Sequence, residues 1–130
     1  MPPKTIPEVF GLKPDMTTRV INAPDNYAEI MSGWQFKISA GKLDFAHLFV
    51  QNQATLHRQL PKLKGQLKPN GMIWVSWLKK SAVQRSGIKT DVNENDIRNF
   101  APEIGLVDIK VCAVSDIWSG LKLVIPVKDR

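Results

Sequence analysis

Two lysines, Lys79 and Lys80, directly follow the apolar stretch from Met72 to Leu78. If that stretch is a parallel strand, its carboxyl end lies where open α/β sheets bind their ligands. Two ammonium groups at such a place suit a phosphate or a carboxylate, although lysines also end strands simply by reaching water. This part of the sequence therefore favours a small anionic ligand, with plain strand termination as the alternative.

Further side chains are expected to line the same crevice. Asn22 and Asn52 follow the first and third expected strands, and parallel strands bring their carboxyl ends to one edge of a sheet. Ser76 lies within the strand that the lysines end, but no Gly-x-Ser-x-Gly turn surrounds it, so a hydrolase nucleophile is not indicated. The predicted crevice residues are Asn22, Asn52, Ser76, Trp77, Lys79 and Lys80, and no residue is predicted to be catalytic.

Few other residues suggest chemistry. Trp118 lies in an expected turn, where a tryptophan is either a plug over the core or part of an interaction surface. His47 lies in an apolar strand and His57 on a polar helix face, and with the one cysteine, Cys112, they form no recognisable metal pattern. We expect no metal site, and we interpret Cys112 as a small buried or half-buried residue.

Composition limits the class of protein. With 130 residues and 43% hydrophobic content, the chain is long enough for one domain with a real core. The net charge of +6 favours anionic partners, but the positive residues are scattered, so nucleic acid has weak support beside a small anion or a protein partner. Because the sequence shows no signal-peptide pattern and no apolar run of eighteen residues, we expect a soluble, cytoplasmic protein.

The pattern of the chain predicts alternating strands and helices. Prolines in residues 1–17 predict an extended lead-in, and residues 18–130 are expected to form a single domain. Leucines at helical spacing predict a helix over 56–67, kinked or divided at Pro61, and residues 79–89 are expected to form a loop. The expected strands are 19–22, 36–40, 44–50, 72–77, 107–113 and 121–127, and the other expected helices are 26–32 and 93–104. This alternation predicts a three-layer α/β sheet, mostly parallel, closed by an antiparallel hairpin.

The order of these elements, with LKPNG (67–71) before the strand MIWVSW, resembles Rossmann-like SAM-dependent methyltransferases. The resemblance implies the strand order 2-1-3-4-6-5 in this chain's own count, with one strand–helix unit missing. The words NAP (22–24), HLFV (47–50), WVSW (74–77) followed by two lysines, and LVDIKVCAVSDIWSGLKLV (106–124) also resemble a family of short bacterial proteins known only as a domain of unknown function.

Two features of a SAM site are missing from the sequence. Such a site needs a glycine-rich turn after the first strand and an acidic residue after the second, which accepts the ribose hydroxyls. This chain has residues 22–24 (NAP) at the first place and residues 39–42 (SAGK) at the second. We therefore predict a non-catalytic binding or regulatory protein with a degenerate cofactor crevice, no cofactor, and no binding of SAM. The alternative is an atypical SAM-dependent methyltransferase.

Overall fold

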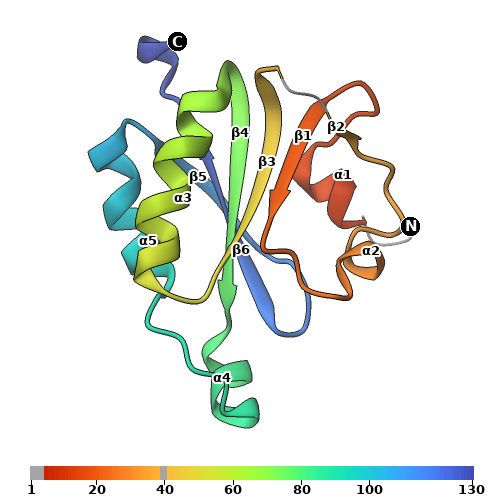
Figure 1. Cartoon of the computed structure of the whole chain (residues 1–130), viewed down its shortest axis with the longest axis vertical. Helices are drawn as coiled ribbons and strands as arrows, with labels where there is room; N and C mark the ends of the chain where they lie inside the picture. The colour runs from red at the N-terminus through yellow and green to blue at the C-terminus, as the bar shows by residue number, and fades with distance from the viewer. Residues whose placement is uncertain (1–4, 39–40) are drawn as a thin grey trace.

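The computed structural model describes residues 5–38 and 41–130. In this part of the chain, six strands form one sheet in the order β2-β1-β3-β4-β6-β5 (Figure 1). The strands are β1 (Thr17–Ile21), β2 (Lys37–Ile38), β3 (Leu43–Val50), β4 (Leu67–Leu78), β5 (Val107–Ala113) and β6 (Trp118–Val124). Only β6 is antiparallel to its neighbours, β4 and β5. The predicted fold class and strand order are therefore confirmed.

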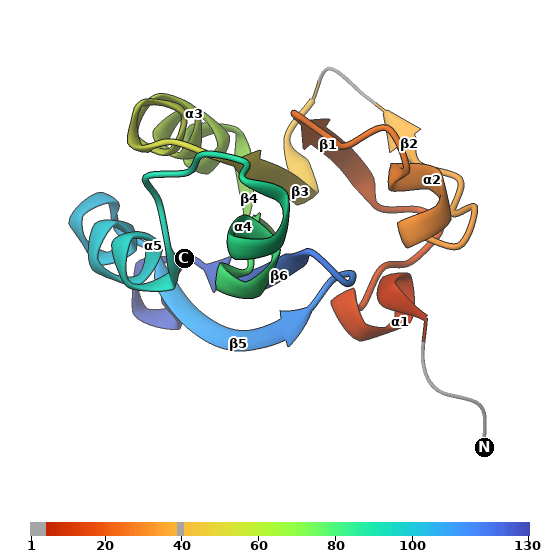
Figure 2. The same ribbon diagram turned by 90° about the horizontal axis from the view of Figure 1, so that it is seen from below.

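Helices cover both faces of the sheet (Figures 1 and 2). The helical elements are α1 (Ile6–Phe10), α2 (Tyr27–Ile30), α3 (Gln53–Gln66), α4 (Lys80–Ser86), α5 (Glu94–Phe100), η1 (Ala101–Ile104) and η2 (Val127–Asp129). On one face, Leu60 of α3 and Ile97 of α5 pack with Leu48 and Val75 of the central strands. On the other face, α1 and α2 cover a core that contains Phe45 and Trp74. Strands β3 and β4 are buried on both faces, which explains why their sequences do not alternate.

The prediction of an extended lead-in is wrong, because α1 lies inside it. Thr5 and Glu8 form a capping box at the start of this helix, and Pro7 occupies its first turn, where a missing N–H costs nothing. Phe10 is fully buried and stacks on Trp74 with ring centroids 4.1 Å apart. The segment therefore contributes to the core instead of lying over it.

Two further expectations about the helices are wrong. Residues 79–89 contain the helix α4, which ends at Gly87 in the left-handed conformation (φ +71°), with Ala82 buried beneath it. Of the two alternatives at Pro61, division into two helices is wrong: α3 is one helix from Gln53 to Gln66. Its leucine stripe stays packed on the core although Pro61 removes one intrahelical hydrogen bond.

The predicted turn at LKPNG takes the form of an irregularity within β4. The register of β3 and β4 shifts between the pairs Leu43–Leu67 and Phe45–Met72, so the extra residues of β4 bulge out. Gly71 is required here, since a Cβ atom on it would lie 2.8 Å from the Leu43 carbonyl oxygen. The expected strand over 36–40 is reduced to β2, and residues 39 and 40 lie outside the described part of the chain.

Candidate functional site

The chain reverses its course across the sheet between β1 and β3. After β1 it passes outward to β2, and it then returns to β3 on the other side of β1. Ligands of open α/β sheets bind at such a switch point, outside the carboxyl ends of the strands. In this structure a cavity of about 370 Å³ lies there, lined by Asn22, Ala23, Phe49, Gln51, Asn52, Thr55 and Trp118. We call it the switch-point cavity.

Asn22 begins the connection that follows β1, and its backbone is left-handed, with φ of +60°. Asparagine is one of the few residues besides glycine that adopt this conformation readily. Its side-chain Nδ2 donates to the Phe49 carbonyl oxygen, at a long 3.5 Å. The sharp turn for which glycine was expected is thus made by an asparagine, and an amide group stands at the mouth of the cavity.

The opposite wall of the switch-point cavity comes from the end of β3 and the start of α3. Asn52 is the N-cap of α3, and its Oδ1 accepts from the Thr55 N–H at 2.8 Å. That bond leaves the Asn52 amide hydrogens available to a ligand. The exposed Gln51 supplies a further amide group. Four polar side chains therefore line the cavity, one directly after β1 and three from residues 51–55, and none of the lining residues is acidic.

Two aromatic rings complete the switch-point cavity. Phe49 and Trp118 meet edge to face with ring centroids 4.9 Å apart, and both are almost fully buried. The Trp118 Nε1 is buried and has no hydrogen-bond partner within the described residues. A buried N–H without a partner is costly, so this donor is a candidate contact for a bound ligand.

Trp118 is therefore not part of an exposed interaction surface. Only 4% of its surface is accessible, so of the two predicted alternatives the structure supports the plug. Its neighbour Ile117 accepts a hydrogen bond from the Lys79 N–H at 2.9 Å, which fixes the hairpin turn against the end of β4.

A second cavity of about 700 Å³ lies at the end of β4, between α4 and the start of α5. Its lining residues are Trp77, Leu78, Lys80, Val83, Thr90, Asp91, Val92, Asn93, Glu94 and Asn95. A smaller hollow of about 270 Å³, lined by Gln51, Asn52, Lys89, Thr90 and Asp91, shares residues with both larger cavities. Because neighbouring cavities share lining residues, we group the three as one trough along the carboxyl edge of the sheet, and we call the second cavity the α4–α5 cavity.

The predicted crevice residues are thus divided. Asn22 and Asn52 line the switch-point cavity, whereas Trp77 and Lys80 line the α4–α5 cavity. Lys79 is half-buried at the start of α4 and lines none of these cavities. Sequence reasoning missed the contributions of Gln51, Thr55 and Phe49, of which Gln51 was open to detection because it directly follows the third strand.

Ser76 does not face the trough. It is fully buried and lies 2.7 Å from His47 Nε2, while His47 Nδ1 lies 2.9 Å from the Tyr27 hydroxyl. Burial lowers the pKa of His47 to about 3 and raises the pKa of Tyr27 well above its usual range. The three side chains form a neutral hydrogen-bonded chain inside the protein. The prediction that Ser76 lines the crevice is wrong, because its side chain is buried against His47.

An apolar cavity of about 340 Å³ lies beside the outer edge of β1. It is lined by Thr18, Arg19, Val20, Ala23, Tyr27, Phe36 and Ile38, and it shares Ala23 with the switch-point cavity. Of the segment where a SAM site has its ribose-binding acid (39–42, SAGK), residues 39 and 40 lie outside the described part of the chain. Lys42 lies before β3, where its Nζ donates to the Gly65 carbonyl oxygen at 2.9 Å.

Solved structures with the same architecture decide the fold family. A magnesium protoporphyrin IX methyltransferase (ChlM) from Synechocystis PCC 6803, solved with bound SAH, superposes with a TM-score of 0.60 at 12% identity, over 92% of this chain and 78% of that one. The same protein with bound SAM gives 0.57 at 12%, over 91% and 74%. The N-methyltransferase NodS from Bradyrhizobium japonicum WM9 gives 0.54 at 9%, over 85% and 86%.

This chain has the fold of class I SAM-dependent methyltransferases. No protein-family model matches the sequence, and no curated protein matches it. Among the described residues, no helix is long and apolar enough to cross a membrane, and no group of three His, Cys, Asp or Glu side chains is arranged to hold a metal ion.

The prediction that SAM does not bind is wrong. Neighbours that share this fold hold SAM or SAH, so the fold points to SAM rather than away from it. The prediction rested on a missing ribose-binding acid and on missing glycines, which let the backbone approach a cofactor closely; in the structure Asn22 makes the turn after the first strand with a left-handed backbone. The acidic residue that accepts the ribose hydroxyls is still missing from the sequence. Its absence removes one contact to the cofactor, but the cavity is present.

Proposed function

We propose that this chain is an atypical, reduced SAM-dependent methyltransferase that binds SAM in the switch-point cavity. The observation that carries the proposal is the polar cavity at the carboxyl ends of β1 and β3, with the left-handed Asn22 at its mouth. A concave site of this size with a few converging polar groups is the usual form of a small-molecule site.

The residues of the cavity fit the parts of SAM. The amides of Asn22, Gln51 and Asn52 offer donors to its carboxylate and acceptors to its ammonium group. The aromatic rings of Phe49 and Trp118 in the cavity wall suit its positively charged sulfonium, since aromatic rings attract cations. The adenine ring would occupy the adjoining apolar cavity, which is lined by Tyr27 and Phe36. This cavity shares Ala23 with the switch-point cavity.

When bound, SAM supplies a methyl group that is activated by the neighbouring sulfonium. The chain's own residues would hold the donor at the switch point and admit an acceptor from the α4–α5 cavity. The hollow between Asn52 and Asp91 joins these two places.

Titration calorimetry with SAM and SAH tests this proposal. We expect micromolar dissociation constants for the natural chain. The double variant Asn22→Gly/Gln51→Ala keeps the left-handed turn but removes two amides, so we expect at least a tenfold loss, or about 1.4 kcal/mol. The control Gln84→Ala/Asn95→Ala removes two amides from α4 and α5 and should bind as the natural chain does. Absence of heat at sub-millimolar SAM would overturn the proposal.

One observation favours a second candidate, a binding or regulatory domain that holds SAM without transferring its methyl group. No acidic side chain lines the switch-point cavity among the described residues, so the ribose has no carboxylate partner there. SAM binding without methylation of any acceptor would support this candidate. The resemblance to short bacterial proteins of unknown function stays a prediction in either case.

A further inference from the structure

The positive charge of the chain is concentrated at α4. Residues 79–90 contain four cations, Lys79, Lys80, Arg85 and Lys89, and no acidic residue. Since the whole chain carries +6, the remaining residues together carry only +2 (6 − 4). The scattered appearance of the charges in the sequence therefore hides one strongly basic segment.

These four cations are available to a partner. Lys80, Arg85 and Lys89 are exposed and Lys79 is half-buried. In the described part of the chain the ion pairs are Lys68–Asp44, Arg98–Glu94 and Arg98–Asp108, so none of the four takes part in one. Figures 1 and 2 show that α4 projects from the end of β4, clear of the other helices. Long-range attraction of an anionic partner would be strongest here.

The basic helix forms one wall of the α4–α5 cavity. Lys80 and Val83 line the cavity from α4, while Asn93, Glu94 and Asn95 line it from the start of α5. The cavity thus combines apolar side chains with amide groups, which suits a flat ring that carries hydrogen-bonding atoms.

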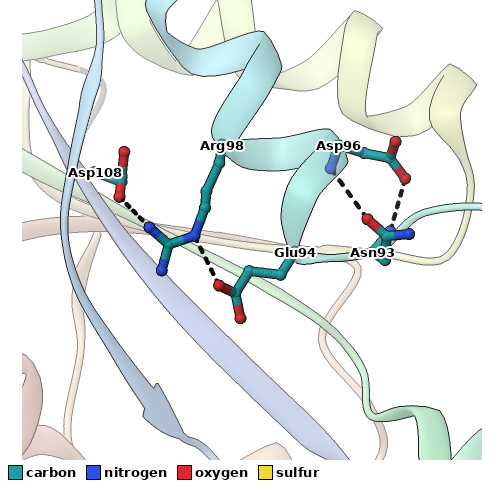
Figure 3. A network of polar contacts seen from close by, with 5 residues as sticks. All are labelled: Asn93, Glu94, Asp96, Arg98 and Asp108. Atoms are coloured by element: carbon teal, nitrogen blue, oxygen red, sulfur yellow. Dashed lines mark hydrogen bonds and ion pairs between the residues drawn. The ribbon is translucent and has the colours of Figure 1, made fainter.

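The acidic groups near the cavity already have partners. Figure 3 shows Arg98 between Glu94 and Asp108, at 2.7 and 2.6 Å, and the Asn93–Asp96 capping box beside them. The Asp91 carboxylate accepts from the Gln53 N–H at 2.6 Å. Arg98 thus partly offsets the charges of Glu94 and Asp108, whereas Asp91 is only hydrogen-bonded, and the cation that lines the cavity, Lys80, comes from the α4 side.

We propose that α4 and the α4–α5 cavity bind single-stranded nucleic acid, with phosphates on the four cations and one base in the cavity. The role of the bound base rests on the proposed function: if the chain is a methyltransferase, the base in the cavity is the methyl acceptor. A base inside a duplex cannot enter a cavity without leaving its stack, so an unpaired strand is the expected form. The exposed large apolar residues near α4 are Ile88 and Ile117, which are too few to suit a lipid surface.

Fluorescence anisotropy with labelled oligonucleotides of about 12 nucleotides, single-stranded RNA or DNA and the matching duplexes, tests the inference at about 50 to 200 mM salt. The test variant replaces Lys79, Lys80, Arg85 and Lys89 by alanine. The control variant replaces Lys13, Lys62, Lys110 and Lys128, four exposed lysines elsewhere, and so has the same net charge. Alanine favours the helical state of α4, so the test variant should fold.

We expect the test variant to lose at least about tenfold in affinity for single strands, and its log K against log salt to become shallower by about 2 to 3, since each lost phosphate contact removes about 0.7. The control variant should lose less than about threefold. Equal losses in both variants, equal binding of duplexes, or tighter binding of an acidic peptide than of oligonucleotides would each overturn the inference.

The test also separates this inference from the proposed function. None of the four cations lines the switch-point cavity, so the test variant should bind SAH with unchanged affinity. Loss of oligonucleotide binding with intact SAH binding is the predicted pattern. If the natural chain binds oligonucleotides through α4 but binds no SAH, the proposed function fails and the nucleic-acid site stands. If it binds SAH but no oligonucleotide, only the inference about α4 fails.

Discussion

At the scale of single residues, the chain from Tyr27 through His47 to Ser76 shows how burial selects a protonation state. His47 is fully buried beside Phe49, whose ring stacks on it with centroids 4.2 Å apart, and no charged group is bonded to it. Its two nitrogens face two hydroxyl groups, so the neutral ring can donate once and accept once. A charged ring would have no compensating anion, which is why its pKa is lowered to about 3.

This arrangement predicts a stability that depends on pH. Between pH 3 and about 6.5 the unfolded chain binds a proton at His47 that the folded chain does not, so stability rises with pH across this window and is lost on acidification. We expect His47 to contribute a slope of roughly 1.4 kcal/mol per pH unit below pH 6.5. Urea unfolding at several pH values should show this slope in the natural chain and lose it in His47→Gln. A variant of the exposed His57, His57→Gln, should keep it, and an unchanged slope in His47→Gln would contradict the account.

Two substitutions of Asn22 distinguish the effect of its left-handed backbone on stability from the effect of its side-chain amide on binding. An alanine in the left-handed region costs roughly 1–2 kcal/mol, whereas glycine adopts this region freely. We expect Asn22→Ala to lower the free energy of unfolding by about 1 kcal/mol and Asn22→Gly to leave it within about 0.5 kcal/mol. Both should bind SAH more weakly, since both lack the amide. Equal stabilities for the two variants in urea unfolding would mean that the left-handed turn is not under strain.

At the scale of elements, the sequence was most informative where burial is continuous. The strand stretches 44–50 and 72–77 predicted β3 and β4, since apolar residues without alternation indicate strands covered on both faces. Helix α4 could not be predicted, because its sequence is polar and it buries only Ala82, so no apolar stripe marks it. The division of the crevice into separate cavities was also hidden, because it depends on how α4 and α5 flank the end of β4.

Gly71 and Gly65 make a matched pair for testing the bulge in β4. A methyl group on Gly71 would lie 2.7 Å from the Leu67 side chain and 2.8 Å from the Leu43 carbonyl oxygen. We expect Gly71→Ala to destabilise the protein by roughly 1–3 kcal/mol. Gly65 lies in α3 with open space around its Cα, so Gly65→Ala should stabilise by up to about 1 kcal/mol. Thermal unfolding of both variants measures this, and a neutral Gly71→Ala would show that β4 adjusts its register freely.

The short helix α1 is expected to stabilise the whole sheet. Phe10 is fully buried and contacts Phe45, His47 and Trp74 through its ring. Phe10→Ala should cost about 3–5 kcal/mol, because it leaves a cavity over the central strands. The exposed neighbour Lys13 provides the control, since Lys13→Ala should change stability by less than about 0.5 kcal/mol. Denaturant unfolding that finds Phe10→Ala as stable as the natural chain would contradict a role of α1 in stabilising the sheet.

At the scale of the whole molecule, the trough along the carboxyl edge of the sheet connects the parts of the account. Its polar end lies at the switch point beside Asn22, and its basic end lies at α4. The resemblance of the sequence implied the strand order, and with it the edge where open α/β sheets bind their ligands. Most of the residues that meet there could not be predicted, because Ala23, Phe49 and Trp118 come from distant segments and carry no joint signal in one sequence.

The four tryptophan indole groups allow the central claim to be tested directly. Trp118 lines the switch-point cavity and Trp77 lines the α4–α5 cavity, whereas Trp34 and Trp74 line neither. In a ¹⁵N–¹H NMR titration with SAH, with the signal of Trp118 assigned from Trp118→Phe, we predict that the Trp118 indole resonance moves progressively while those of Trp34 and Trp74 stay in place. Four unchanged indole resonances in excess SAH, or movement confined to Trp34 and Trp74, would contradict the claim that SAM binds at the switch point.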